Sequence, residues 1–191
     1  GTSCEIHMDG ELIRAEIKVP GQHQVTNTLA AVRVAKLLGL DMEQMTRGIA
    51  SVVPIAGRNR IIQEGSFTLI DDCYNANPVS MKAALDLLSL ADTRKVAILG
   101  DMFELGENSD MLHSGVGCYA KGKTDLLICI GENAKHIYDG AKEAGVAHIY
   151  HFTDKESFLR EKENLLQAGD TILLKASHGM AFETLISQLL Q

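Results

Sequence analysis

The segment from Phe67 to Leu88 most constrains the fold, because it contains a strand pattern, a polar loop and a helix pattern in immediate succession. The apolar run at residues 67–70 predicts the strand. Asn77 before Pro78 predicts the helix start, since asparagine caps helices and proline is tolerated in their first turn. One apolar helix face follows at Met81, Ala84, Leu85 and Leu88. Open α/β sheets place ligands at the strand ends of such units.

Beyond this segment, short apolar runs alternate with helical patterns. We expect strands at residues 96–99, 126–130, 147–152 and 171–174, with amphipathic helices between and after them. Three of these runs are apolar without interruption, which is typical of strands covered on both faces. The alternation predicts an α/β fold with a Rossmann-like, doubly wound, mostly parallel sheet and right-handed crossovers.

The first 53 residues have a different character. Period-two alternation around Asp9-Gly10 predicts a β-hairpin, and two helical patterns follow it. The second helix is expected to start at a capping box made by Asp41 and Gln44. The first is expected from Asn27 to a stop at Gly39. Its predicted apolar face consists of Ala31, Val34, Ala35 and Leu38.

A stretch that contains Pro54 and Gly57 but shows no periodicity separates these two parts of the chain. We therefore predict a first domain at residues 1–53, a linker at residues 54–59 and a C-terminal α/β domain at residues 60–191. The second domain is expected to begin with another hairpin, turning at residues 64–66.

Polar residues concentrate in the loops that leave the predicted parallel strands. Since the carboxyl ends of parallel strands share one edge, the loops at residues 71–77, 100–106, 131–133 and 175–179 should lie close together. Asp71 and Asp72 could bind Mg²⁺ or ribose hydroxyls, or only cap a turn. Arg58 could be a solvated charge or a clamp for phosphate. His113 is expected on the surface of a helix.

Residues 117–124, G-C-Y-A-K-G-K-T, match the pattern of a phosphate-binding P-loop. A working P-loop follows a strand and opens a helix, so that backbone N–H groups meet the phosphates. Here an amphipathic helix precedes the match and a strand follows it. We therefore interpret Gly122 as the cap of a helix C-terminus and reject the P-loop.

Composition excludes several classes of protein. The net charge of −7 argues against sequence-independent nucleic-acid binding, which requires an overall positive field. The four cysteines show no CxxC spacing and form no convincing metal set with the histidines, so reduced thiols in a cytoplasm are expected. No apolar run approaches the ~18 residues of a membrane span.

Five segments, taken in order, resemble the Mur ligase family. They are G-Q-H-Q-V-T-N-T-L-A-A at 21–31, G-R at 57–58, I-D-D-C-Y-N-A-N-P-V-S-M-K-A-A-L at 70–85, L-G-D-M-F-E-L-G at 99–106 and L-K-A-S-H-G-M at 174–180. The chain is most similar to the branch that adds D-alanyl-D-alanine to a UDP-N-acetylmuramoyl-tripeptide. The resemblance implies a cytoplasmic enzyme of peptidoglycan synthesis. In this family ATP phosphorylates the terminal carboxylate of the UDP-linked peptide, the amine of the dipeptide attacks the acyl phosphate, and Mg²⁺ offsets the charge.

The resemblance also implies roles for individual residues. Asn27 would lie near the adenine, Arg58 near the terminal phosphates, Asp72 on the ribose and Tyr74 beside the nucleotide. Candidates near the incoming dipeptide are Asn75, Asn77, Lys175 and Ser177.

By the same resemblance, residues 1–53 are the tail of a central ATP-binding domain. The P-loop, most Mg²⁺ ligands and the UDP contacts would belong to an upstream part of the enzyme, in its N-terminal and central domains. No catalytic residue and no metal ligand is therefore assigned in these 191 residues, which are expected to be inactive alone.

The sequence departs from the family pattern at several positions. Gln24 stands where asparagine is usual, Cys73 where serine is common, and residues 176–178 read A-S-H in place of G-S-R. His178 puts a carboxylate clamp in doubt, because a neutral imidazole cannot make the bidentate contact of arginine. A non-catalytic, Rossmann-like module that binds a small molecule is the alternative interpretation, and a scaffold domain whose polar loops only cap helices is a third.

Overall fold

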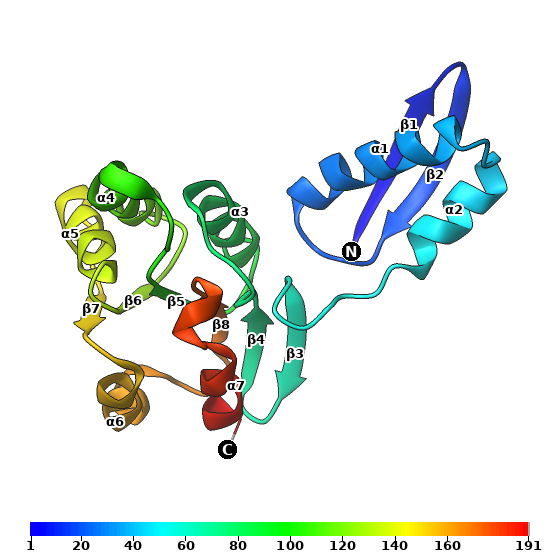
Figure 1. Ribbon diagram of the computed structural model, residues 1–191. Helices are drawn as coiled ribbons and strands as arrows, with labels where there is room; N and C mark the ends of the chain where they lie inside the picture. The colour runs from blue at the N-terminus through cyan, green and yellow to red at the C-terminus, as the bar shows by residue number, and fades with distance from the viewer. Residues whose placement is uncertain (191) are drawn as a thin grey trace. The chain divides into compact units, whose positions relative to one another are not determined.

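The computed structural model describes residues 1–190 and contains two compact units, divided between Ile55 and Ala56. The division falls within the predicted linker. Figure 1 shows a hairpin and two helices in the first unit and a central sheet flanked by helices in the second. Among residues 1–190, no helix combines the length and apolar character required to cross a membrane.

The first unit is a β-hairpin packed against two helices. β1 (Thr2–Met8) and β2 (Glu11–Ile17) are antiparallel, and the turn residues Asp9 and Gly10 have positive φ angles of 52° and 80°. Two-residue hairpin turns favour this conformation, so the predicted hairpin is confirmed. α1 (Gln22–Leu37) and α2 (Met42–Ser51) follow, and the predicted capping box opens α2.

α1 differs from its prediction in both its start and its buried face. It begins at Gln22, so His23 lies inside the helix. Val32 is its buried side chain, whereas Val34 and Leu38 of the predicted apolar face are exposed. Isoleucines of the hairpin and the apolar face of α2 fill most of this small core. Because apolar residues occur on several sides of α1, periodicity alone did not identify the side that packs.

The second unit is a six-stranded sheet. Its strands are β3 (Arg60–Glu64), β4 (Phe67–Asp71), β5 (Lys95–Gly100), β6 (Leu126–Ile130), β7 (Ile149–Phe152) and β8 (Thr171–Lys175). Its helices are α3 (Pro78–Leu88), α4 (Ser109–Tyr119), α5 (Ala134–Ala144), α6 (Lys155–Leu165) and α7 (Glu183–Leu189), with 3₁₀ turns η1 (Gly106–Asn108) and η2 (His178–Met180). The strand order is β3-β4-β8-β5-β6-β7, and only β3 is antiparallel to its neighbour. The predicted mostly parallel sheet is therefore confirmed.

Alternate residues of the central strands face two separate cores. On β5, Ala97 and Leu99 pack with side chains of α3, α4 and α5, whereas Val96 and Ile98 pack with those of α6 and α7. Figure 1 shows these two groups of helices on opposite faces of the sheet. Such strands need apolar side chains at every position, which explains the uninterrupted apolar runs.

The start of α3 is as predicted. Asn77 Oδ1 accepts a hydrogen bond from the Ser80 N–H at 2.9 Å, and the Asn77 N–H donates to Ser80 Oγ at 3.1 Å. Pro78 occupies the first turn. The four apolar residues of the predicted face, Met81, Ala84, Leu85 and Leu88, are all buried.

The P-loop-like residues lie in a helix, a turn and the approach to a strand. α4 ends at Tyr119 with Ala120 as its C-cap, slightly earlier than predicted, and Gly122 follows in the turn with φ of 74°. Gly117 lies inside α4, where an added Cβ would meet Ala141 N of α5 at 2.7 Å. This glycine allows two helices to approach closely, and the order of elements supports rejection of a P-loop.

Candidate functional site

The loops after β5 and β8 are joined to each other at the carboxyl edge of the sheet. The Ser177 N–H donates to the Asp101 carbonyl at 3.0 Å, and the Phe103 N–H donates to Ser177 Oγ at 2.8 Å. A Cβ at Gly100 would meet Ala176 Cβ at 2.7 Å, so the end of β5 and the loop after β8 approach more closely than a larger residue would allow.

Asp101 also connects the β5 loop to α5, the helix that follows β6. Its Oδ1 accepts a hydrogen bond from the Ala134 N–H at 2.6 Å, where the positive end of the helix dipole favours a carboxylate. A Cβ at Gly131 would lie 2.6 Å from Asp101 Cγ, so a larger residue does not fit there without movement. The predicted meeting of the loops after β5, β6 and β8 is confirmed.

Lys175 connects β8 to the β4 loop through a buried ion pair. Its Nζ donates to Asp72 Oδ2 at 2.5 Å, to the Asn75 carbonyl at 3.0 Å and, more weakly, to the Asp72 carbonyl at 3.5 Å. The lysine is only 1% exposed. A buried ammonium group requires acceptors for its three protons, and these three atoms supply them. The amine is therefore occupied within the protein. Its contacts also bring the β4 loop to the edge where the other three loops meet.

The segment 57–59 is fastened to the β4 loop by its backbone. The Gly57 N–H donates to Asp71 Oδ2 at 2.8 Å, the Tyr74 N–H donates to the Gly57 carbonyl at 3.0 Å, and the Asn59 N–H donates to Asp72 Oδ1 at 3.2 Å. Gly57 and Asn59 have positive φ angles of 76° and 51°, which glycine and asparagine tolerate better than most residues. Arg58, between them, is thus held on both sides.

Three side chains from three segments form an exposed cluster above this network. The guanidinium carbon of Arg58 lies 4.0 Å from the centre of the Tyr74 ring. The His178 ring lies 5.8 Å from the Tyr74 ring, centre to centre, with an angle of 35° between their planes. Tyr74 is half exposed. A cation over an aromatic face is attracted by the ring quadrupole, so the ring and the guanidinium stabilise each other's position.

The candidate acceptor residues differ in accessibility. Asn75 is exposed, and its Oδ1 accepts from the Ala76 N–H at 2.8 Å. Asn77 is also exposed but uses its Oδ1 to cap α3. Ser177 is buried at 4% exposure, with its oxygen bound by Phe103. Asn27 belongs to the first unit, where its Nδ2 donates to Gln24 Oε1 at 3.2 Å.

The prediction that His113 lies on the surface is wrong, because its imidazole is fully buried. Nε2 accepts a hydrogen bond from the Met102 N–H at 2.9 Å, and Nδ1 lies 2.8 Å from the Ser109 carbonyl. These contacts assign the proton to Nδ1. His113 therefore holds the β5 loop against α4, which the polar flank of a helix did not indicate.

Cys73 lies within the β4 loop but is chemically protected. Burial raises the pKa of its thiol well above the usual range, and the Asp71 carboxylate raises it further. The thiol donates to the Leu174 carbonyl at 3.3 Å. Since the thiolate is the reactive form, this cysteine is not a nucleophile here.

The described residues contain no cluster of metal-binding side chains. Among residues 1–190, no group of three or more His, Cys, Asp or Glu side chains could hold a metal ion. Asp71 Oδ2 and both oxygens of Asp72 accept hydrogen bonds from protein donors. The carboxylates of the β4 loop therefore organise the protein backbone.

Residues that hold the loops together were the hardest to identify from sequence. Asp71, Asn59 and Asp101 all act through hydrogen bonds that involve the backbone. Asp71 was a candidate for Mg²⁺ or ribose hydroxyls, and no role was predicted for Asn59 or Asp101. One usable signal existed: glycine and asparagine flank Arg58, and both types tolerate positive φ. That pattern indicates a segment with a defined backbone conformation and not a flexible linker.

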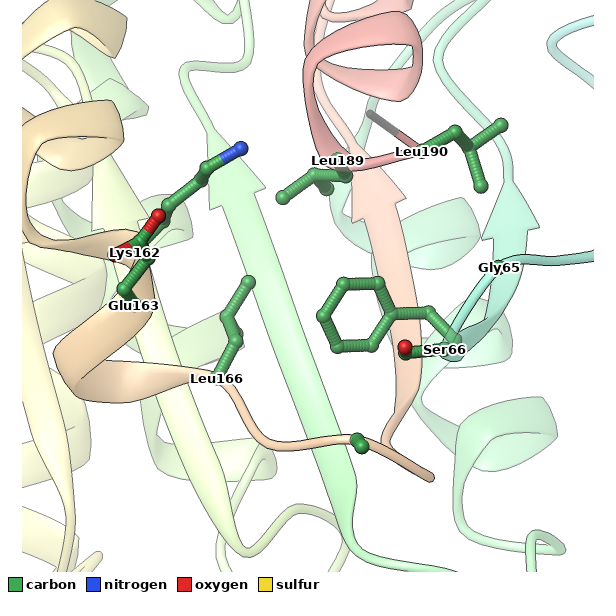
Figure 2. A pocket seen from close by; sticks show the side chains of 9 residues that line it. Gly65, Ser66, Lys162, Glu163, Leu166, Leu189 and Leu190 are labelled. Carbon is green, nitrogen blue, oxygen red and sulfur yellow. The ribbon is translucent and has the colours of Figure 1, made fainter.

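A pocket of about 340 Å³ lies at the opposite, amino edge of the sheet. Figure 2 shows Leu166, Leu189 and Leu190 around it, with Lys162 and Glu163 nearby. Lys162 Nζ donates to the Gln188 carbonyl at 2.5 Å, which ties α6 to α7. None of the predicted site residues lines this pocket, so the candidate site and this cavity occupy different edges.

Comparison with known proteins gives consistent matches. The family model described as "Mur ligase, glutamate ligase domain" matches residues 57–178. The UDP-N-acetylmuramoyl-tripeptide--D-alanyl-D-alanine ligase of Bacillus subtilis is 32% identical over 180 residues, which cover 92% of this chain and 39% of that protein. The protein of the same name from Synechocystis is 37% identical over 193 residues, covering 96% and 42%.

Solved structures agree with these matches. A crystal structure of MurF from Acinetobacter baumannii superposes with a TM-score of 0.88 at 30% identity, covering 98% of this chain and 42% of that one. MurF ligase from Thermotoga maritima, in complex with ADP, has a TM-score of 0.82 at 22% identity and supports the fold. The chain spans about two fifths of the length of the curated relatives it matches.

Proposed function

The chain belongs to the Mur ligase family, and from this premise we propose that it contributes to an ATP-dependent ligase joining D-alanyl-D-alanine to a UDP-N-acetylmuramoyl-tripeptide. The observation that carries the proposal is identity of 32% and 37%, over more than nine tenths of this chain, to two curated ligases with that name. The loops of the carboxyl edge lie inside the matched family domain, except that the last loop extends one residue beyond it.

The proposed reaction has two steps. The γ-phosphoryl group of ATP is transferred to the terminal carboxylate of the UDP-linked tripeptide, which gives an acyl phosphate and ADP. The amine of the dipeptide then attacks the acyl carbon, phosphate leaves, and an amide bond forms. Charge builds up on the transferring phosphoryl oxygens, so fixed positive groups near them are required.

On the nucleotide side, we assign Arg58 to the phosphates, because it is an exposed cation held beside the β4 loop and guanidinium groups bind oxyanions with paired donors. We assign Asp72 to the ribose, where a carboxylate oxygen with a second lone pair can accept a hydroxyl. We place Tyr74 beside the nucleotide. Asn27, in the first unit, is our candidate for the adenine contact.

On the acceptor side, the candidate groups can donate hydrogen bonds. The side-chain oxygens of Asn75 and Asn77 are used by backbone N–H groups, which leaves their Nδ2 groups to donate. Ser177 Oγ accepts from Phe103, which leaves its own proton to donate. A set of donors complements the free carboxylate of a dipeptide. Lys175 would act indirectly, by fixing Asn75 and Asp72.

Mg²⁺ is not assigned to these residues, since no fitting set of donors occurs among residues 1–190. We also propose that the 191 residues do not turn over ATP alone, because their one P-loop-like match begins inside α4 and precedes β6, the reverse of the order that a P-loop requires. Phosphate release by the purified chain with tripeptide and dipeptide present would contradict this second proposal.

Kinetics of the full-length ligase test whether the carboxyl edge binds the nucleotide. Asp72→Ala should raise the KM for ATP by roughly tenfold, as expected for loss of a hydrogen bond to a charged group, and raise the KM for the dipeptide less. Asp92→Ala, which changes an exposed aspartate outside the carboxyl-edge loops, is the matched control and should leave both values unchanged. An unchanged KM for ATP in Asp72→Ala would remove Asp72 from the nucleotide site.

Two measurements on the full-length protein distinguish a ligase from a module that only binds a small molecule. A ligase releases phosphate in proportion to the amide formed. A module that only binds a small molecule would show saturable heat with ATP, ADP or the dipeptide in calorimetry and no amide in the full-length protein. That result would overturn the proposed activity.

A further inference from the structure

We infer that Tyr74 is a positioning residue that holds the Arg58 guanidinium ready for an oxyanion, an inference that rests on the proposed function. Arg58 is the group that meets the phosphates in this proposal. Tyr74 acts through Arg58, and its ring is not a surface on which the nucleobase stacks. The 4.0 Å distance from the guanidinium carbon to the ring centre is the primary observation.

The backbone on either side of Arg58 is fixed before any ligand binds. Gly57 is bonded through both its N–H and its carbonyl, to Asp71 and Tyr74, and the Asn59 N–H is bonded to Asp72. A Cβ at Gly57 would meet Tyr74 N at 3.1 Å, which shows how closely the two segments approach. What remains to be ordered is the long Arg58 side chain, and Tyr74 lies beneath its end.

The contact with Tyr74 leaves the Arg58 donors available. Among residues 1–190, no carboxylate forms an ion pair with Arg58, in contrast to the paired cations Lys175 and Arg94. An aromatic face attracts the positive charge without offering a lone pair, so the five N–H groups stay free for an oxyanion. Ordering the side chain in advance lowers the entropic cost of binding.

A base-stacking role for Tyr74 makes a different prediction. The ring already has Arg58 at 4.0 Å and the His178 ring at 5.8 Å, so it is shared by two protein side chains. If the base stacked on Tyr74, removal of the ring would weaken nucleotide binding whether or not Arg58 were present. If Tyr74 positions Arg58, the effect of removing the ring depends on Arg58.

A double-mutant cycle in the full-length ligase separates these two roles. Tyr74→Leu should raise the KM for ATP about two- to fivefold, the range of an exposed cation–π contact, and Tyr74→Phe should match the wild type. In the Arg58→Ala background, Tyr74→Leu should add nothing. An undiminished effect of Tyr74→Leu in that background overturns the inference. Tyr150→Leu, at a tyrosine of similar exposure on β7, is the control.

Nuclear magnetic resonance of the 191-residue chain tests the contact independently of catalysis. Ring currents of Tyr74 should shift the side-chain resonances of Arg58 upfield, and the shift should vanish in Tyr74→Leu and persist in Tyr74→Phe and Tyr150→Leu. If the full-length protein forms no amide, the proposed function fails while this measurement still decides the contact. An Arg58 shift that does not change in Tyr74→Leu overturns the inference whatever the activity.

Discussion

β8 has an ion pair at each end, and the two pairs connect β8 to different segments of the chain. At the amino end, Asp170 accepts from Arg94 at 3.0 Å and from the Gln167 N–H at 2.9 Å, while Arg94 also donates to the Leu165 carbonyl. The contacts of Arg94 join the start of β5 to the connection between α6 and β8, and the Gln167 contact lies within that connection. At the carboxyl end, Lys175 joins β8 to the loop that leaves β4.

The difference lies in what each pair supports. The carboxyl-end pair holds a loop that presents Tyr74, Asn75 and, through Asp72, the segment of Arg58. The amino-end pair lies at the edge that holds the cavity of about 340 Å³, and none of the predicted site residues lines that cavity. The candidate site at the carboxyl edge is therefore recognised by a buried polar network that lies under exposed side chains.

The largest difference between the two ends is expected for loss of their cations. Lys175→Met removes the ammonium group that is buried against the Asp72 carboxylate, which should cost about 3–5 kcal/mol of unfolding free energy. Arg94→Met should cost less, about 1–2 kcal/mol, because the Arg94 side chain is 31% exposed and water replaces part of the interaction. Urea unfolding measures both values. Equal losses would show that the two pairs contribute equally to stability.

Substitution of two glycines, one at each edge, should give an effect of intermediate size on stability. Gly131 has φ of 125° and no room beside Asp101, so Gly131→Ala should cost about 3 kcal/mol. Gly169, at the amino edge, has φ of 91° but no atom within 4 Å of an added Cβ, so Gly169→Ala should cost only about 1–2 kcal/mol. Thermal unfolding of the two variants checks the order, and a larger loss at Gly169 would contradict the close packing inferred for the carboxyl edge.

The smallest effect concerns two exposed carboxylates, one at each edge. Hydrogen bonds from the Ser157 N–H to Asp154 and from the Lys95 N–H to Asp125 lower the pKa of each carboxyl. Both contributions are therefore present above about pH 4, the ordinary range of a carboxyl pKa, and are lost as the pH falls through the lower folded values.

Asp154→Asn and Asp125→Asn should each flatten the loss of stability between about pH 5 and pH 3, and by similar amounts. Urea midpoints at the two pH values measure the slope. A much larger change for one variant would show that exposed carboxylates, and not only the buried pairs, distinguish the two edges.

Much of the fold follows from local sequence patterns. The cap and buried face of α3, the capping box of α2 and both hairpins were predicted, because each depends on residues close together in sequence. The meeting of four loops at one edge was predicted as well, since it follows from parallel strand order alone.

The rest depended on contacts between distant segments. The burial of His113 follows from its bond to Met102 in the β5 loop, and no helical pattern encodes that neighbour. Lys175 looked like a ligand-binding cation, but its three acceptors all come from the β4 loop. The contact of Arg58 with Tyr74 likewise required the segment 57–59 to be folded back onto that loop.

The place of β8 in the sheet has a consequence for biosynthesis. β8 is the last strand of this sheet in sequence, yet it lies between β4 and β5, and Ile172 faces Leu69 on one side and Val96 on the other. During translation β4 and β5 leave the ribosome well before the strand that joins them, and each has an unpaired edge in the interval. A message cut short before the codon of Thr171 thus yields two part-sheets without their central strand, which chaperones and proteases can distinguish from the finished protein.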